Sequence, residues 1–435
     1  MTLKNISNLE SNFSESWNRG LEKIKDLNAF DKFMTIFWLI GPFIYLIERS
    51  PADIWLTSLG LCFIYRCIRN KHWYWLNQLW VKSILIFWIV AIFSSIISPD
   101  PEFSTSRAIV WIRFPLYAVA AQVWLAKEKE IRYLMLLSLL VGSLIMMCFI
   151  SYEFFYPFNI ADFGPKGRLT GPYGDHVPGG YFAKVCLPIF CISVSLINSK
   201  NKVLSLVCTL FVVLFFAHTI MTGERIHVLI LVCSAFLALL FWKVNVKKFV
   251  ILFSLIVSLF CIYFLSFSQQ LTHRFSESFV KSLPLNMSYD NPYWGAWRSG
   301  LQQGLETPII GIGANGTRKT CKYLPFTHKL PGKNYCGNHP HNFYIQFFAE
   351  TGLVGLFFGI GMCFFIIKTC WDARNIKEPE IFSYIAFIIP LAIFFPFQNH
   401  GNFFGQWGNL FIWIAIGLSI SNNQKWYNQK LEKII

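Results

Sequence analysis

Twelve apolar runs separated by short polar gaps constrain this chain more than any other feature of its sequence. Crossing the hydrocarbon core of a bilayer takes about 20 helical residues, and most of these runs span or nearly span it. With 54% hydrophobic and only 14% charged residues, against about 25% charged in a soluble domain, the chain is expected to be an all-α integral membrane protein with about 12 transmembrane helices. The runs lie at about 33–47, 53–68, 83–97, 108–125, 132–151, 180–197, 203–221, 226–242, 248–267, 353–368, 381–396 and 407–420.

Lysine and arginine are concentrated in alternate gaps between these runs. If the N-terminus is cytoplasmic, the cytoplasmic gaps carry 23 of these residues and the short outer gaps carry 5, as the positive-inside rule predicts. Both termini are therefore expected inside. The net charge of +15 follows from this orientation, and no nucleic-acid partner is expected. The short outer gaps are 48–52, 98–107, 152–179, 222–225 and 397–405.

The gaps divide the chain into five parts. Residues 1–32 form a cytoplasmic N-terminal segment in which no cleavable signal peptide is expected, and 33–267 hold the first nine spans. Residues 268–352 form one large outer loop with short helices, 353–420 hold spans ten to twelve, and 421–435 form a cytoplasmic tail.

Two cysteines, Cys321 and Cys336, lie in the large outer loop, whereas the other ten lie in the apolar spans or at their ends. An oxidising outer compartment favours a disulfide that would staple this loop. Two unrelated thiols are the alternative.

Two histidines, His339 and His341, lie one residue apart where the large loop meets an apolar helical run. Zinc needs three or four ligands, and no partner set lies nearby, so no metal site is expected. The pair could cap the helix from 342 onward. It could also supply a general base at the membrane lip, because imidazole titrates near neutral pH. Glu350 can converge with His341 only if the helix breaks near Gly352.

Basic residues lie at the ends of several spans. Arg225 closes the turn Thr222–Arg225, where its guanidinium can bind phosphate bidentately. It can equally snorkel to the interface or bridge Glu224. Lys184 and Arg113 lie near predicted span ends, and for each of them a functional role and snorkelling are both open.

A Gly/Pro-rich outer loop, 167–180, carries Arg168, Asp175 and His176. Such turn chemistry beside charged residues suits a binding loop, although an ordinary connector has a similar composition.

The segment Gly311–Gly316 matches the dinucleotide-binding pattern G-x-G-x-x-G. That pattern needs a preceding strand, a following helix and a βαβ unit, which a loop of about 80 residues cannot house. Its glycines are expected to allow tight turns after Pro308.

Together, these motifs resemble the O-antigen ligase and polymerase superfamily of bacterial envelopes. The family hallmark H-x-H-N-x-x-L-Q-x-x-x-E-x-G-x-x-G-L is matched from His339 to Leu356, with Ile345 in place of a leucine. The resemblance covers roughly residues 165–360, and the first five spans match only in hydropathy. Other similar segments are the approach segment Trp297–Gly313, the S/T-G-x-R turn at Thr222–Arg225, and the R-L-x-G loop at Arg168–Gly171 with Gly180.

The chain departs from the family before Trp297. The family often has an arginine there, where this chain has Asn291–Ala296. Arg298 and Arg274 are the candidates to replace it.

The resemblance implies a GT-C-like glycosyltransferase of the bacterial inner membrane, with its active site at the periplasmic face and without metal or cofactor. Its donor would be a glycan on undecaprenyl pyrophosphate. His341 would take the proton from the acceptor hydroxyl, and His339 would either position His341 or share the proton transfer. Direct displacement would invert the anomeric configuration. The leaving pyrophosphate would be stabilised by arginines, and two residues would support the site. The arginines are Arg225, Arg168, Arg298 and Arg274, and the supporting residues are Asn342 and Glu350.

The acceptor distinguishes the branches of this superfamily. A ligase transfers to a lipid A-core sugar, and a polymerase transfers to another repeat unit. The Thr222–Arg225 turn favours the ligase, and the lack of a large C-terminal soluble domain disfavours a protein-glycosylating enzyme. A polytopic polysaccharide transporter is a further alternative. Transporters place ionisable groups near the bilayer midplane, whereas here they gather on one outer face.

Overall fold

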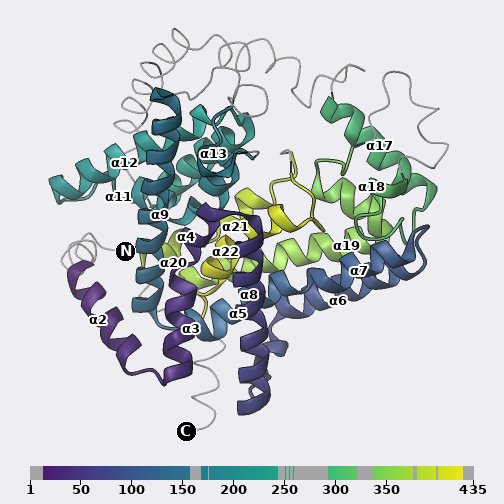
Figure 1. The fold of residues 1–435 in the computed structure, drawn as a ribbon, viewed down its shortest axis with the longest axis horizontal. Helices are drawn as coiled ribbons and strands as arrows, with labels where there is room; N and C mark the ends of the chain where they lie inside the picture. The colour runs from purple at the N-terminus through teal and green to yellow at the C-terminus, as the bar shows by residue number, and fades with distance from the viewer. Residues whose placement is uncertain are drawn as a thin grey trace.

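The computed structural model describes residues 13–156, 168–174, 176–242, 292–320, 337–375, 380–397 and 400–424, with the single positions 250, 254 and 258. Within these residues the protein is helical and contains no strand (Figure 1). The helices are α2 Phe13–Lys25, α3 Ala29–Leu39, α4 Gly41–Ile47, α5 Arg49–Asn70, η1 Tyr74–Asn77, α6 Leu79–Ile96, α7 Pro101–Trp111, α8 Arg113–Ala120, η2 Ala121–Leu125, α9 Lys129–Phe155, η3 Gly171–Tyr173, η4 Tyr181–Val185, α11 Leu187–Leu196, α12 Lys202–Met221, α13 Arg225–Trp242, α17 Pro292–Glu306, α18 Thr317–Thr320, α19 Phe343–Asp372, η6 Ala373–Asn375, α20 Ile381–Ile385, α21 Ile388–Ile393 and α22 Gln406–Ile420.

Eleven of the twelve predicted apolar runs coincide with helices, and the run 248–267 falls outside the described residues except at positions 250, 254 and 258. Six helices are long and apolar enough to cross a membrane, or seven if α3 and α4, bent by 48°, form one span. Three others are shorter: α11, α20 with α21, and α22. The 15 residues of α22 extend about 22 Å, less than a hydrocarbon core of about 30 Å. A helical membrane protein is therefore confirmed, while twelve spans and a GT-C arrangement stay predictions.

Helix α19 starts at Phe343, in agreement with the helix expected from 342 onward. It extends beyond 352, the predicted boundary between the large loop and the next span. Asn342 caps it, because its Oδ1 accepts hydrogen bonds from the backbone N–H groups of Tyr344 and Ile345 at 3.0 and 3.2 Å. Such a cap satisfies donors that the first helical turn leaves open. The end of the large loop is therefore a helical turn packed into the protein.

The same helix breaks at Gly352, whose φ of 67° and ψ of −169° are not helical. The break leaves the carbonyl of Ala349 and the N–H of Leu353 without each other as partners. A neighbouring segment takes both groups: Ile312 N–H donates to Ala349 at 3.0 Å, and Leu353 N–H donates to Pro308 at 2.8 Å. Buried backbone groups need such partners. The helix therefore does break near Gly352, which the sequence set as the condition for Glu350 to approach His341.

Glycines let the two backbones approach this closely. A Cβ atom on Gly352 would lie 2.2 Å from the carbonyl carbon of Ile309, and one on Gly311 would lie 2.5 Å from that of Glu350. Gly311 also has a φ of 77°, a value that favours glycine. The glycines after Pro308 therefore serve tight turns and backbone packing rather than dinucleotide binding.

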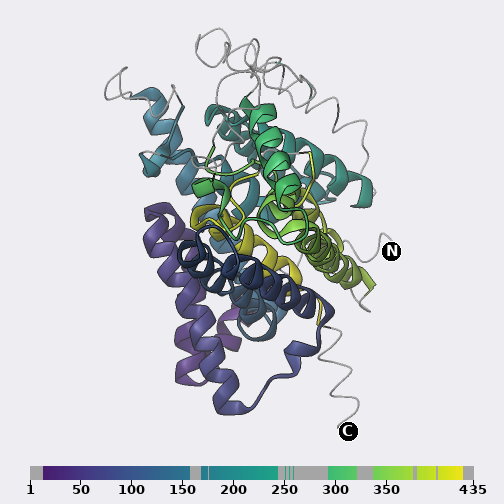
Figure 2. The same ribbon diagram turned by 90° about the vertical axis from the view of Figure 1, so that its right-hand side faces the viewer.

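An aromatic cluster joins α19 to the loop before α22. Phe347 on α19 packs 5.1 Å from Phe87 on α6 and 4.7 Å from Phe403, measured between ring centroids. Trp111 lies 5.2 Å from Phe403. Edge-to-face packing of this kind adds specific geometry to apolar burial. The cluster holds the loop 400–405 against the first half of α19, and α17 packs against the same half (Figure 2).

Candidate active site

A cavity of about 1150 Å³ opens where the predicted outer gaps meet. Its lining includes residues from all five short outer gaps and from the large loop, and no described residue of a predicted cytoplasmic gap. The gaps that charge counting assigns to one side therefore do meet in space. That this side is the periplasmic one stays a prediction.

The cavity wall is strongly basic. Among the described lining residues, Glu224 is the one carboxylate. Clefts lined by one sign of charge concentrate ligands of the opposite sign, so the wall is complementary to an anion. The lining cations are Arg49, Arg107, Arg168, Lys184, Arg225 and Arg318.

Glu224 is held by its neighbours inside this wall. Its Oε2 lies 2.9 Å from Nδ1 of His227. Burial raises the pKa of Glu224, but His227, Arg168 and Lys184 outweigh it and hold the pKa below its ordinary value. The carboxylate is therefore ionised near neutral pH. It pairs with His227, and its field also reaches Arg168 and Lys184.

Arg168 is placed by the end of α9. The Glu153 carboxylate accepts hydrogen bonds from the backbone N–H groups of Thr170, at 2.9 Å, and Gly171, at 2.6 Å. These bonds fix the R-L-x-G loop beside the cavity. The Nε of Arg168 is buried and has no hydrogen-bond partner among the described residues. Arg168 thus presents a donor and a full charge to the cavity wall.

Arg225 is the first residue of α13 and also lines the cavity. Gly223, with a φ of 68°, makes the turn that brings it there. Its guanidinium forms a hydrogen bond with Tyr293 of α17. From the sequence, phosphate binding, snorkelling and pairing with Glu224 were all open for Arg225. The structure places Arg225 at the cavity.

The two histidines also line the cavity. Their ring centroids lie 4.1 Å apart, and His341 has a left-handed backbone with a φ of 57°. The carbonyl of His341 accepts a hydrogen bond from His400 N–H at 2.8 Å, and the Tyr293 ring packs edge-on to His341 at 5.8 Å. Since Asn342 caps α19, the histidines are not needed as helix caps.

The surroundings of His339 make its imidazole a poor base. Burial and, second, the neighbouring His341 lower the pKa of His339 to about 3, although a hydrogen bond with the backbone of His400 acts in the opposite direction. A group with that pKa is a weak proton acceptor at neutral pH. Of the two histidines, His339 is therefore the weaker candidate for the base. No group of three or more His, Cys, Asp or Glu gathers in the described part of the chain.

The carboxylate of Glu350 hydrogen-bonds to described residues other than His341. Glu350 is fully buried, and its Oε2 accepts hydrogen bonds from Asn315 N–H at 2.8 Å and from Gln346 Nε2 at 3.0 Å. Gln346 Nε2 also donates to Asn402 Oδ1 at 2.8 Å. Asn315 and Asn402 line the cavity, so Glu350 supports its floor. A helix break near Gly352 was the condition for Glu350 to approach His341. The break is present, but it does not by itself bring the two residues together.

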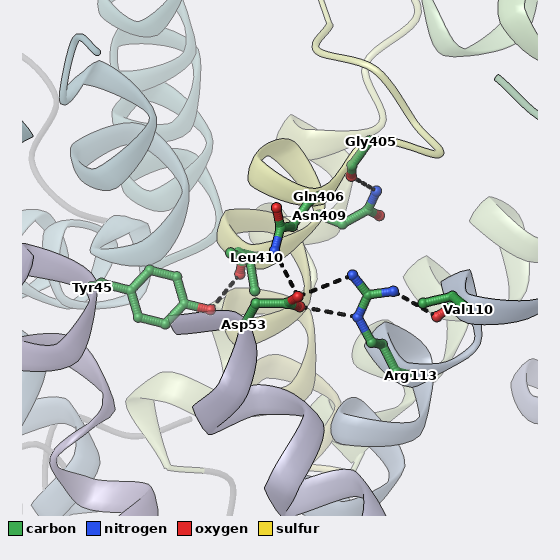
Figure 3. Close-up of polar contacts among 8 residues, drawn as sticks. All are labelled: Tyr45, Asp53, Val110, Arg113, Gly405, Gln406, Asn409 and Leu410. Atoms are coloured by element: carbon green, nitrogen blue, oxygen red, sulfur yellow. Dashed lines mark hydrogen bonds and ion pairs between the residues drawn. The ribbon is translucent and has the colours of Figure 1, made fainter. Parts of the chain in front are cut away.

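Arg113, which the sequence left open, is held in an internal ion pair (Figure 3). Its Nε and Nη2 lie 3.0 and 3.2 Å from the two carboxylate oxygens of Asp53, and its Nη1 donates to Val110 O at 2.8 Å. Gln406 Nε2 donates to the same carboxylate at 2.6 Å. Arg113 therefore ties α5, α8 and α22 together.

The remaining predicted residues are not among the described residues that line the cavity. Arg298 lies on α17 but is not among the described lining residues. Arg274, Cys321, Cys336 and Asp175 lie outside the described residues, so the disulfide and that arginine stay predictions.

The structure adds residues that the sequence did not single out, chiefly His400, Tyr293 and Asn402, and it gives Lys184 a place on the wall. The loop 397–405 has no Lys or Arg, so charge counting passed over it. A histidine and two asparagines among aromatic residues were the available signal.

These features define a class: a helical membrane protein whose short loops enclose a basic cavity with paired histidines. Residues 210–360 match the family model described as O-antigen ligase, and this match supports an assignment to the O-antigen ligase and polymerase superfamily. The match includes Arg225, Tyr293 and both histidines. No curated protein matches the chain. The superfamily consists of glycosyltransferase-like membrane enzymes, as the motif resemblance predicted.

Proposed function

We propose that this protein is an O-antigen ligase, which transfers a glycan from undecaprenyl pyrophosphate to a sugar hydroxyl of lipid A-core. The observation that carries this proposal is the meeting of two chemistries in one cavity. Arg168, Lys184 and Arg225 supply positive charge, and His341 lies on the same wall. Bond cleavage at a sugar phosphate needs both a site for the leaving anion and an acceptor for a proton.

The basic side receives the leaving group. Breaking the bond between the anomeric carbon and the phosphate leaves negative charge on undecaprenyl pyrophosphate. Hydrogen bonds to charged groups contribute about 1.5–3 kcal/mol each, and groups placed before the reaction stabilise charge most effectively. Arg225 and Arg168 take this role, and Lys184 adds a third positive charge. The lipid tail of the donor stays in the bilayer.

His341 serves the acceptor. Its imidazole takes the proton from the attacking hydroxyl, whose oxygen forms the new bond to the anomeric carbon. Such general-base assistance contributes roughly 10²–10⁴-fold. Because the hydroxyl attacks opposite the leaving phosphate, the anomeric configuration inverts. His339 packs against His341 and positions it.

Transfer by purified protein in lipid nanodiscs tests the proposal. The donor is an undecaprenyl pyrophosphate-linked glycan, offered with lipid A-core and, separately, with a second lipid-linked repeat unit. We expect glycosylated lipid A-core, formed equally with EDTA present. Transfer only to the repeat unit would identify the alternative, an O-antigen polymerase.

His341→Ala tests the base within the same assay. We expect kcat to fall by roughly 10²–10⁴-fold, while His72→Ala, at an exposed position away from the cavity, keeps wild-type kcat. Full activity of His341→Ala would refute the assignment. Labelling of a cysteine at position 341 from the cytoplasmic side would instead support a transporter.

A further inference from the structure

Tyr293 touches both chemical halves of the cavity. Its hydroxyl is a hydrogen-bond partner of the Arg225 guanidinium. Its ring packs against His341, with centroids 5.8 Å apart and an interplanar angle of 86°. Both contacts come from one half-buried side chain that lines the cavity. Within the described residues, Tyr293 is therefore a direct physical link between the basic wall and the histidine pair.

The helix that carries Tyr293 is held firmly against the histidine loop. A Cβ atom on Gly300 would lie 2.7 Å from Cγ of Pro340, and one on Gly304 would lie 2.4 Å from Cδ1 of Phe348. The glycines thus allow α17 to pack closely on the segment that contains His341. Because dense packing restricts movement, Tyr293 keeps a fixed place relative to that segment.

The proposed reaction needs such a link. In an inverting transfer, the acceptor hydroxyl and the leaving phosphate lie on opposite sides of the anomeric carbon. The base and the phosphate-binding group must therefore stand at a fixed separation, and a misplacement of about 1 Å can cost 10²-fold in rate. Arg225 and His341 come from segments more than a hundred residues apart, so neither one alone sets their spacing.

We propose that Tyr293 is a positioning residue that fixes the Arg225 guanidinium relative to the His341 imidazole. This inference rests on the proposed glycosyl transfer. The hydroxyl orients the guanidinium toward the pyrophosphate, and the ring supports the imidazole from its side. Within the described part of α17, Tyr293 faces the cavity and Arg298 does not, so the helix contributes alignment rather than a further positive charge.

Tyr293→Phe separates these two contacts, because it removes the hydroxyl and keeps the ring. We expect kcat/KM for the donor to fall about 10-fold or more, the effect of losing a hydrogen bond to a charged group. Binding of undecaprenyl pyrophosphate itself should weaken to a similar degree. Tyr293→Leu also removes the ring beside His341, so kcat should fall by a further factor of about ten.

The matched control is Tyr45→Phe. Tyr45 is a buried tyrosine that is not among the described lining residues of the cavity, and its hydroxyl donates to Leu410 O at 2.8 Å. Its variant should show a lower Tm with unchanged donor binding and kcat/KM. A structural role for Tyr293 would give the same pattern in Tyr293→Phe, and that result would overturn the proposal.

A double-mutant cycle tests the route of action. If Tyr293 acts through Arg225, adding Tyr293→Phe to Arg225→Lys should cost less than twofold, because coupled residues are not additive. Full additivity would overturn the proposal. Wild-type protein that neither binds undecaprenyl pyrophosphate nor transfers glycan would defeat the proposed function itself. Normal wild-type turnover with an unaffected Tyr293→Phe would defeat only the role of Tyr293.

Discussion

Two groups of basic residues in this protein differ in how their charge is neutralised. In one, Arg113 forms an ion pair with Asp53 through two short contacts, and Gln406 donates a further hydrogen bond to the Asp53 carboxylate (Figure 3). In the other, the cavity wall, neither Arg168 nor Lys184 forms a direct ion pair within the described part of the chain, and Glu224 is bound to His227. In the first group, the protein itself supplies the counter-charge. The second has positive charge left for a ligand.

This difference separates stabilising from functional residues of the same type. Arg113 and Arg225 both lie near span ends, and the sequence offered the same alternatives for each. Arg113 is about one-fifth exposed and matched to a carboxylate that is equally covered. Arg225 lies on a wall where cations outnumber the single carboxylate among the described lining residues. Substitutions should therefore affect folding in one place and catalysis in the other.

Arg225→Lys gives the largest expected effect on this comparison. Lysine keeps the charge but loses the planar fork that binds phosphate bidentately. We expect kcat/KM for the donor to fall about 10- to 100-fold, the size of one hydrogen bond to a charged group, with little change in Tm. Arg113→Lys is the matched control and should show the reverse, a lower Tm with unchanged kcat/KM. Equal behaviour of the two variants would abolish the distinction.

Asp53→Asn tests the first group, the ion pair between Arg113 and Asp53. It leaves the Arg113 guanidinium without its counter-charge in a mostly covered position, which should destabilise the protein by about 1–3 kcal/mol. Thermal unfolding in detergent measures this loss. Adding Arg113→Gln should recover part of it, because the uncompensated charge is then gone. An unchanged Tm in Asp53→Asn would show that this pair contributes nothing to stability.

Local patterns in the sequence predict the helices well and the site only in part. Apolar runs and capping residues such as Asn342 act within a few residues, so the helices and their approximate ends follow from them. The outer gaps could be grouped because lysine and arginine report the side of the membrane. The contacts of Tyr293 and His400 with His341 join segments distant in the chain, and no local pattern encodes them. A break near Gly352 could be named from the sequence as a condition, but the pairing of the Glu350 carboxylate with the distant Asn315 N–H could not.

The smallest expected effect concerns His339, a neutral group kept in the basic wall. Its pKa is lowered to about 3 by burial and then by His341, whereas an unfolded histidine titrates near 6.5. Below pH 6.5, His339 is protonated in the unfolded chain but stays neutral in the folded protein. The free energy of unfolding therefore falls as the pH drops. The expected loss is about 1 kcal/mol for each pH unit between 6.5 and 5.

His339→Asn removes this titration and should make Tm less dependent on pH across that interval, measured against wild-type protein in the same detergent. His72→Asn is the control, because His72 is exposed and its loss should leave the pH dependence of Tm unchanged. The positive charge of Arg113 is matched by Asp53 within the fold. At His339 the fold keeps the imidazole neutral, and the positive charge that a ligand meets is that of the arginines. An identical pH dependence of Tm in His339→Asn and wild-type protein would show that His339 accepts its proton in the folded state, and the basic wall would then carry one more charge at low pH than this account allows.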